Sequence, residues 1–127
     1  MSELSALDDF IAAVRRLETL PEDAARLAAP LVEEALRATA AAGTDPDGHT
    51  WQPKKDGGRP LVHAAEHITV KAVGTLVRAT LTGPDVYHHF GAGVPRRQIL
   101  PDPGTIPPGV ARALEKASAL AFDRAGV

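Results

Sequence analysis

Apolar residues recur every three or four positions near both ends of the sequence, the spacing that places them on one face of an α-helix. At the N-terminal end this spacing predicts two antiparallel amphipathic helices joined by a tight turn. The first has its apolar positions at Leu4, Leu7, Phe10, Ile11, Val14 and Leu17, and the second at Leu27, Leu31, Val32 and Leu36. In the second helix Pro21 suits the first turn, Pro30 is expected to cause a kink and Gly43 to end it.

The composition limits what these helices can pack against. Apolar residues make up 44% of the 127 residues but aromatic residues only 4%, so we expect an aliphatic, alanine-rich core and closely packed helices. Another helix is predicted to begin near Pro107 and Pro108. Its apolar face consists of Val110, Ala113, Leu114, Ala117 and Ala121. A chain of this length is typical of one domain, and we assign residues 1–127 to a single domain.

Charge and cysteine content argue against several classes of protein. The formal net charge of −2 disfavours a general nucleic-acid binder, which normally has a strongly basic domain. Without cysteine, the chain has no disulfide or thiolate metal site. No apolar run approaches the ~20 residues that span a bilayer, and the first residues lack the pattern of an export signal. We therefore expect no membrane association and synthesis as a soluble cytosolic protein.

The middle of the chain predicts a small sheet and a long loop. Residues 68–71 and 76–81 alternate or are β-branched on either side of Val73-Gly74, which predicts a β-hairpin. Residues 94–100 are the candidate third strand, confined to an edge by their prolines, and residues 61–67 suggest a short helical turn. The predicted fold class is α+β, with an N-terminal helical hairpin, a small antiparallel β-sheet and a C-terminal helix.

Residues 43–60 form the predicted loop, which is rich in glycine, proline and charged residues and has Trp51 as its only large apolar group. Loops of this length without structure of their own are usually functional or disordered. Trp51 indicates partial order, because it would either pin the loop to the body of the domain or meet a partner. Buried aromatic residues mostly serve packing, which favours the first role.

The stretch 85–101 has the features of a docking segment. Tyr87 and Phe90 share one face if the backbone is helical, although Phe90 would fit the core equally well. Gly91 and Gly93 allow a sharp turn, and an extended cationic segment with Arg96-Arg97 follows. Of the adjacent histidines, we expect one to pack beside Tyr87 and Phe90 and the other to be exposed.

A second histidine motif suggests different chemistry. His63, Glu66 and His67 match the H-x-x-E-H spacing of inverted zinc peptidases, in which two histidines share a helix face and the glutamate acts as base. A third ligand would have to come from a distant acid, and the motif runs directly into a predicted strand. Surface histidines at a helix–strand junction are the preferred interpretation. We therefore assign no catalytic residue, metal ligand or cofactor.

Three motifs follow one another along the chain: Gly-x-Asp-Pro-Asp-Gly-x-x-Trp-x-Pro over 43–53, Tyr-His-His-Phe-Gly over 87–91, and Val-Pro-Arg-Arg-Gln-Ile-Leu-Pro over 94–101. Together with the C-terminal helix, this order resembles the phage virion morphogenesis family, the tail-completion or neck proteins of tailed bacteriophages and prophages. The matching positions are Trp51, Pro53, Tyr87, His89, Phe90, Gly91, Pro95, Arg96 and Leu100. The chain departs from the family pattern at Ile99, where phenylalanine is common, in the segment 61–67, and in a basic loop reduced to Lys54-Lys55.

The resemblance implies a structural protein without catalysis, acting as a homo-oligomeric ring of six expected subunits. Its implied partners are copies of itself, the connector or adaptor proteins of the phage head and the tail tube proteins, with incidental contact to passing DNA. Its implied location is the neck or tail of the virion, and the host cytoplasm during assembly. The expected interface residues are Trp51, Tyr87, His89, Phe90, Arg96 and Arg97.

Two functions of other classes stay open on sequence grounds. One is a small metal-dependent hydrolase that uses His63, Glu66 and His67. The other is a DNA-binding module. The basic spots, Lys54-Lys55 with Arg59 and Arg96-Arg97, could contact passing DNA or an acidic protein face. The acidic balance of the chain speaks against the second.

Overall fold

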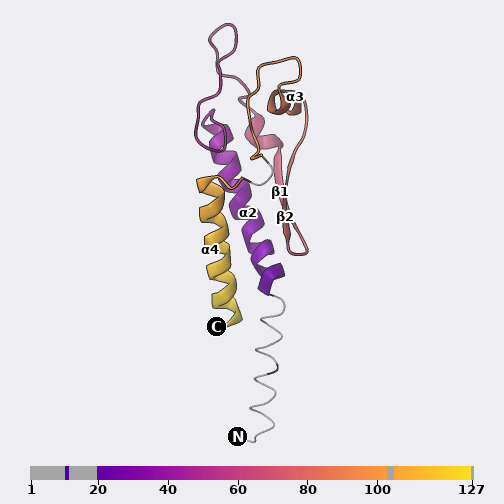
Figure 1. The fold of residues 1–127 in the computed structure, drawn as a ribbon, viewed down its shortest axis with the longest axis vertical. Helices are drawn as coiled ribbons and strands as arrows, with labels where there is room; N and C mark the ends of the chain where they lie inside the picture. The colour runs from indigo at the N-terminus through magenta and orange to yellow at the C-terminus, as the bar shows by residue number, and fades with distance from the viewer. Residues whose placement is uncertain (1–10, 12–19, 103–104, 127) are drawn as a thin grey trace, which may run out of the picture.

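The fold combines helices with a small antiparallel sheet, which confirms the predicted α+β class. The computed structural model describes residue 11 and residues 20–102 and 105–126. The predicted helix over residues 4–17, and with it the N-terminal helical hairpin, lies outside the described residues apart from position 11. Figure 1 shows helix α2 in the centre, with the β-hairpin on one side and helix α4 on the other.

Helix α2 spans Leu20–Ala41 and has acidic Glu22 and Asp23 in its first turn, where the helix dipole favours negative charge. The helix continues past Pro30, which lies inside it. It ends near Gly43, as predicted, because Gly43 takes the left-handed φ of 78° that the reversal of the chain needs. The following amides return to the helix: Thr44 N donates to Thr39 O at 3.0 Å.

Helix α4 spans Pro108–Ala125 and runs antiparallel to α2, as both views show. The contact between them is built mostly from alanine, as the composition predicts. The buried positions are Ala25, Ala28, Ala29, Val32, Leu36 and Ala40 on α2 and Ala113, Ala117, Ala121 and Ala125 on α4. Small side chains on both faces let the two backbones approach closely. The contact is then stabilised by many short-range dispersion contacts and not by a few bulky apolar side chains.

Strands β1 (Ile68–Val73) and β2 (Leu76–Leu81) form the predicted hairpin, with Ile68 opposite Leu81 and Val73 opposite Leu76. They are connected through Gly74 and Thr75, one residue later than expected. The free edge of β1 is closed by α2: Arg37 donates to Ile68 O at 2.8 Å, and Val70 N donates to Glu33 Oε1 at 3.1 Å. These side chains satisfy backbone groups that an edge strand would otherwise expose.

The predicted third strand is wrong, because the described sheet has two strands and residues 94–100 are in neither. The backbone amides of this segment have other acceptors. Arg97 N donates to His88 O, and Ile99 N donates to the imidazole of His89. A segment whose donors are used by a neighbouring helix cannot also continue a strand ladder, and its prolines have none to give.

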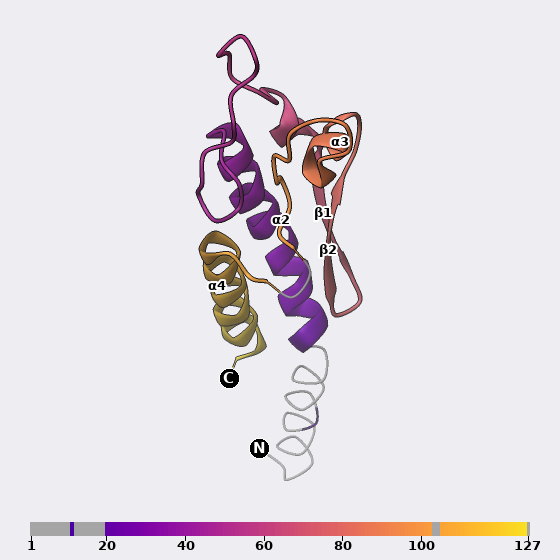
Figure 2. The same cartoon turned by 45° about the horizontal axis from the view of Figure 1, so that its top comes forward.

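One end of the molecule holds the irregular segments. The 43–60 loop, helix α3 (Asp85–Phe90) and the arm formed by residues 91–100 lie at the end of the molecule where α2 has its C-terminal part (Figures 1 and 2). We call these three segments the loop–arm module. The hairpin turn lies towards the opposite end of the molecule, which is also the end at which α4 terminates, although the two are on opposite sides of α2.

Candidate functional site

Helix α3 is a short helix that presents the aromatic pair. It ends at Gly91, whose φ of 72° allows Gly91 N to donate to His88 O and Ala92 N to donate to Tyr87 O. The helical backbone places Tyr87 and Phe90 on neighbouring surface positions, with 61% and 72% of their surface exposed. The sequence left open whether Phe90 belongs to the core or to the surface. The structure places it at the surface.

Trp51 fixes the loop to the arm. Its side chain is 5% exposed, and its indole Nε1 donates to Gln98 O at 2.8 Å. The sequence left two roles open for Trp51, to pin the loop to the body of the domain or to meet a partner. The buried side chain and its hydrogen bond show the first. Any role of Trp51 at an interface would be indirect, through the position of the loop that it holds.

Arg97 also turns inward, although the sequence placed it among the expected interface residues. It is 4% exposed, and its guanidinium donates to Gln52 O at 2.7 Å, Pro53 O at 3.1 Å and His88 Nδ1 at 2.9 Å. The side chain thus joins the loop, α3 and the arm. Its contribution to an interface would likewise come from holding the module in shape.

Arg96 stays at the surface, on the opposite side of the arm. Its guanidinium forms an ion pair with Asp102 at 2.9 Å and donates from Nε to His89 O at 3.2 Å. Neighbouring side chains of an extended segment point to opposite faces, so one of the two arginines can turn inward while the other stays exposed. Local sequence carries no signal for which one does so.

His89 accepts two hydrogen bonds from the arm. Its Nδ1 lies 3.2 Å from Ile99 N and 3.4 Å from Leu100 N, and its ring meets Phe90 edge to face at 4.8 Å. Burial lowers the pKa of His89 below 6.5, the nearby Arg96 lowers this pKa further, and Asp102 opposes the shift. Only an imidazole without a proton at Nδ1 can accept these hydrogen bonds. The hydrogen-bond geometry and the lowered pKa therefore both favour the neutral form of His89.

The expected division between one packed and one exposed histidine is not found. Both His88 and His89 are half-buried, because the arm folds back over α3 and both rings accept hydrogen bonds from it. The three motifs that are widely spaced in the sequence therefore form one connected unit. Sequence reasoning missed that His88 and Arg97 join its parts.

The His63, Glu66 and His67 motif does not assemble as a zinc site. Residues Ala64–His67 form a 3₁₀-helix, in which side chains four apart do not stack as they do on an α-helix. His63 Nδ1 lies 3.6 Å from Glu66, whereas His67 hydrogen-bonds through Nδ1 to the buried Asp85. Within the described residues, no three His, Cys, Asp or Glu side chains come together to hold a metal ion. The His67–Asp85 pair instead joins the start of β1 to the start of α3.

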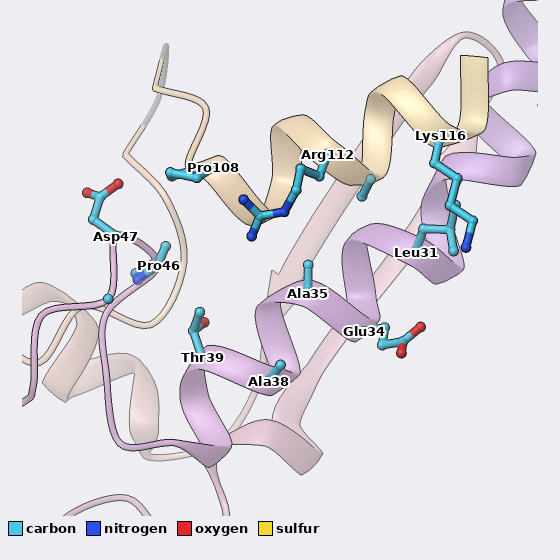
Figure 3. A pocket seen from close by; sticks show the side chains of 13 residues that line it. Leu31, Glu34, Ala35, Ala38, Thr39, Pro46, Asp47, Pro108, Arg112 and Lys116 are labelled. Carbon is cyan, nitrogen blue, oxygen red and sulfur yellow. The ribbon is translucent and has the colours of Figure 1, made fainter. Parts of the chain in front are cut away.

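A groove with a volume of about 500 Å³ lies between α2, α4 and the turn at residues 46–48. Figure 3 shows Ala35, Ala38 and Leu31 along α2, with Arg112 and Lys116 on the α4 side. Glu34 and Asp47 line the same groove, so charges of both signs face it. This mixed lining selects no particular ligand charge.

Comparisons of the chain with protein-family models, with curated proteins and with solved structures give no match. A search of the described helices for one long and apolar enough to cross a membrane also finds none.

Proposed function

We propose that this chain is a structural subunit of a tailed bacteriophage or prophage virion, and that copies of it form a ring at the head–tail junction. In this role it completes the tail or joins it to the head. Its partners are copies of itself, the connector or adaptor proteins and the tail tube proteins. It is placed in the neck or tail of the virion after assembly in the host cytoplasm.

The observation that carries this proposal is the exposed aromatic pair. The chain has only three phenylalanines, one tyrosine and one tryptophan, and two of these aromatic residues are exposed on the six residues of α3. Aromatic residues and arginine are enriched in protein interfaces, where they provide much of the binding energy. Tyr87, Phe90 and the exposed Arg96 fit such a contact.

The construction of the module supports the same role. Trp51, Arg97 and His89 fix the segment behind the aromatic pair through hydrogen bonds to backbone groups. A surface that is already ordered before binding loses less conformational entropy when a partner arrives. The positions that carry the family resemblance, Trp51 and His89 among them, belong to this framework, so the resemblance and the geometry converge on one part of the molecule.

Sedimentation analysis of the purified full-length chain tests the proposal. The wild type is expected to form a discrete oligomer of about six subunits, as the resemblance implies, and the double variant Tyr87→Ser/Phe90→Ser to weaken association by about 30-fold or more. Phe122→Ser is the matched control, because Phe122 is a similarly exposed aromatic residue on α4. Circular dichroism checks that each variant stays folded.

A particle reconstruction, or labelling of assembled virions, tests the location independently. The chain is expected at the head–tail junction. A wild-type protein that stays monomeric at all concentrations and is missing from the neck of particles would overturn the proposal.

A further inference from the structure

A second groove lies inside the loop–arm module, between the loop and the arm, and has a volume of about 440 Å³. Unlike the groove between α2 and α4, it has a lining of one charge sign. Its polar walls include Lys54, Lys55, His88 and Arg97, and Val94 and Pro95 form apolar surface beside them. None of the described residues that line it is acidic. A concave surface of one charge sign with apolar walls concentrates the electrostatic field and attracts the opposite charge.

Arg97 strengthens this field from inside. A guanidinium has five N–H donors, and the three hydrogen bonds of the Arg97 guanidinium go to two backbone carbonyls and to the imidazole Nδ1 of His88. In the described part of the chain, no carboxylate forms an ion pair with it. A buried charge is costly without a counter-charge, and its attraction to an incoming anion is stronger than in water.

We propose that this groove binds a carboxylate group presented by an acidic protein segment with aliphatic residues beside it. The carboxylate would accept charge-assisted hydrogen bonds from Lys54 and Lys55 at the rim and from the remaining donors of Arg97. Val94 and Pro95 would contact the aliphatic neighbours. This inference concerns a surface distinct from Tyr87 and Phe90, and it does not depend on ring formation.

The lining favours a protein carboxylate over nucleic acid. Binding to DNA relies on several phosphate contacts spaced along a basic stripe, whereas this site is one pocket on a chain of formal net charge −2. A single anionic group with apolar surroundings matches the pocket better than a long polyanion does. For the basic pair Lys54-Lys55, the sequence left both an acidic protein face and DNA open; the lining of the groove favours the first.

Nuclear magnetic resonance titration of the labelled full-length chain tests the proposal. The probe is the blocked peptide acetyl-Ala-Glu-Leu-Glu-Ala-amide, and the control is the same peptide with glutamine at both glutamate positions. We expect saturable shifts of the amides at 52–55 and 94–97 with a dissociation constant of about 1 mM. The glutamine peptide should produce none, and raising NaCl from about 50 mM to about 500 mM should weaken binding.

The double variant Lys54→Gln/Lys55→Gln should weaken binding about fivefold to tenfold, because two charge contacts are lost at an accessible rim. These lysines are exposed, so the change leaves the fold intact. Lys71→Gln, at an exposed position on β1, is the matched control and should bind as the wild type does. Equal responses to both peptides, or an equal loss in the Lys71→Gln variant, would overturn the proposal.

Inorganic phosphate and a short DNA duplex provide the other comparisons. If either one shifts the same amides at lower concentration than the acidic peptide does, the assignment to a protein carboxylate is wrong. A weaker response to both supports it. The oligomeric state, measured in parallel, shows whether the ring proposal and this site succeed or fail separately.

Discussion

The α2–α4 contact and the loop–arm module are held together in different ways. The helix contact repeats alanine along two regular helices, so its stability is spread over many small and similar contacts. The module consists of irregular segments and a short helix, and it depends on a few side chains that each connect separate segments, chiefly Trp51, Arg97 and His89. A distributed contact is expected to tolerate the loss of one small group, whereas a contact built from single connections fails when one of them is removed.

Trp51→Ala is expected to have the largest effect. Removing a buried tryptophan costs about 3–5 kcal/mol, and the Gln98 carbonyl also loses its donor. The loss should be concentrated in the module. Hydrogen exchange should therefore show faster exchange of amides at 43–60 and 94–100, while the amides of α2 and α4 keep their order of protection.

Trp51→Phe separates packing from hydrogen bonding in this experiment. Phenylalanine keeps most of the apolar volume but has no Nε1 donor, so its cost should be smaller, about 1–3 kcal/mol. If Trp51→Ala instead accelerates exchange equally in α2, α4 and the module, then the module is not a separate unit, and the comparison above is wrong.

Ala117→Leu tests the helix contact in the opposite direction. Ala117 is 1% exposed in the contact with α2, so three additional carbon atoms have no space, and overpacking should cost about 1–3 kcal/mol. The effect should appear as a lower denaturation midpoint of the whole domain. Ser118→Leu is the control, because Ser118 lies next to it on the exposed side of α4. Since leucine is a better helix former than serine, Ser118→Leu should not destabilise the helix, and a similar loss in both variants would show that packing against α2 is not responsible.

The regular part of the fold could be predicted because its determinants are local or periodic. Helical spacing predicted α2 and α4, the alanine content predicted close packing of helices, and the β-branched runs predicted the hairpin. The third strand was predicted wrongly, since the acceptors for the amides of Arg97 and Ile99 lie on α3, which sequence spacing cannot show.

The candidate site was predictable in outline but not in its connections. The 3.6-residue period placed Tyr87 and Phe90 on one face, and their exposure is consistent with the docking role. Whether Arg96 or Arg97 turns inward depends on carbonyls at Gln52 and Pro53, more than 40 positions away. Such long-range polar contacts leave no periodic pattern in the sequence, which is why the role of Arg97 as an internal connector was missed.

Gly91→Ala tests the turn that connects α3 to the arm. A side chain at φ 72° is strained by roughly 1–2 kcal/mol, and the added Cβ would lie 3.1 Å from the Cβ of Arg96. Gly93→Ala is the matched control, because Gly93 has a similar φ of 74° with no atom within 4 Å of the added carbon. Gly91→Ala should therefore lower the midpoint of urea unfolding more than Gly93→Ala does. Equal losses would mean that Arg96 moves aside at no cost.

Protonation of His89 should give the smallest and most specific effect. The pKa of His89 is lowered in the folded chain, first by burial and then by Arg96, while Asp102 opposes the shift. Below pH 6.5, the unfolded chain therefore binds a proton more readily than the folded chain does. The stability that His89 contributes is complete above pH 6.5 and is lost as the pH falls through the lower folded pKa. Protonation also places an N–H at Nδ1, against the amides of Ile99 and Leu100.

His89→Asn removes this titration but keeps a side-chain oxygen that can accept from the arm. The urea midpoint should therefore fall less between about pH 7 and about pH 5 in this variant than in the wild type. His63→Asn is the control, because His63 is largely exposed and its loss should leave the pH profile of the wild type. If His63→Asn flattens the profile as much as His89→Asn does, the arm is not held by the neutral imidazole. If only His89→Asn flattens it, a single imidazole sets the acid sensitivity of the module, whereas the buried positions of α2 and α4 are aliphatic.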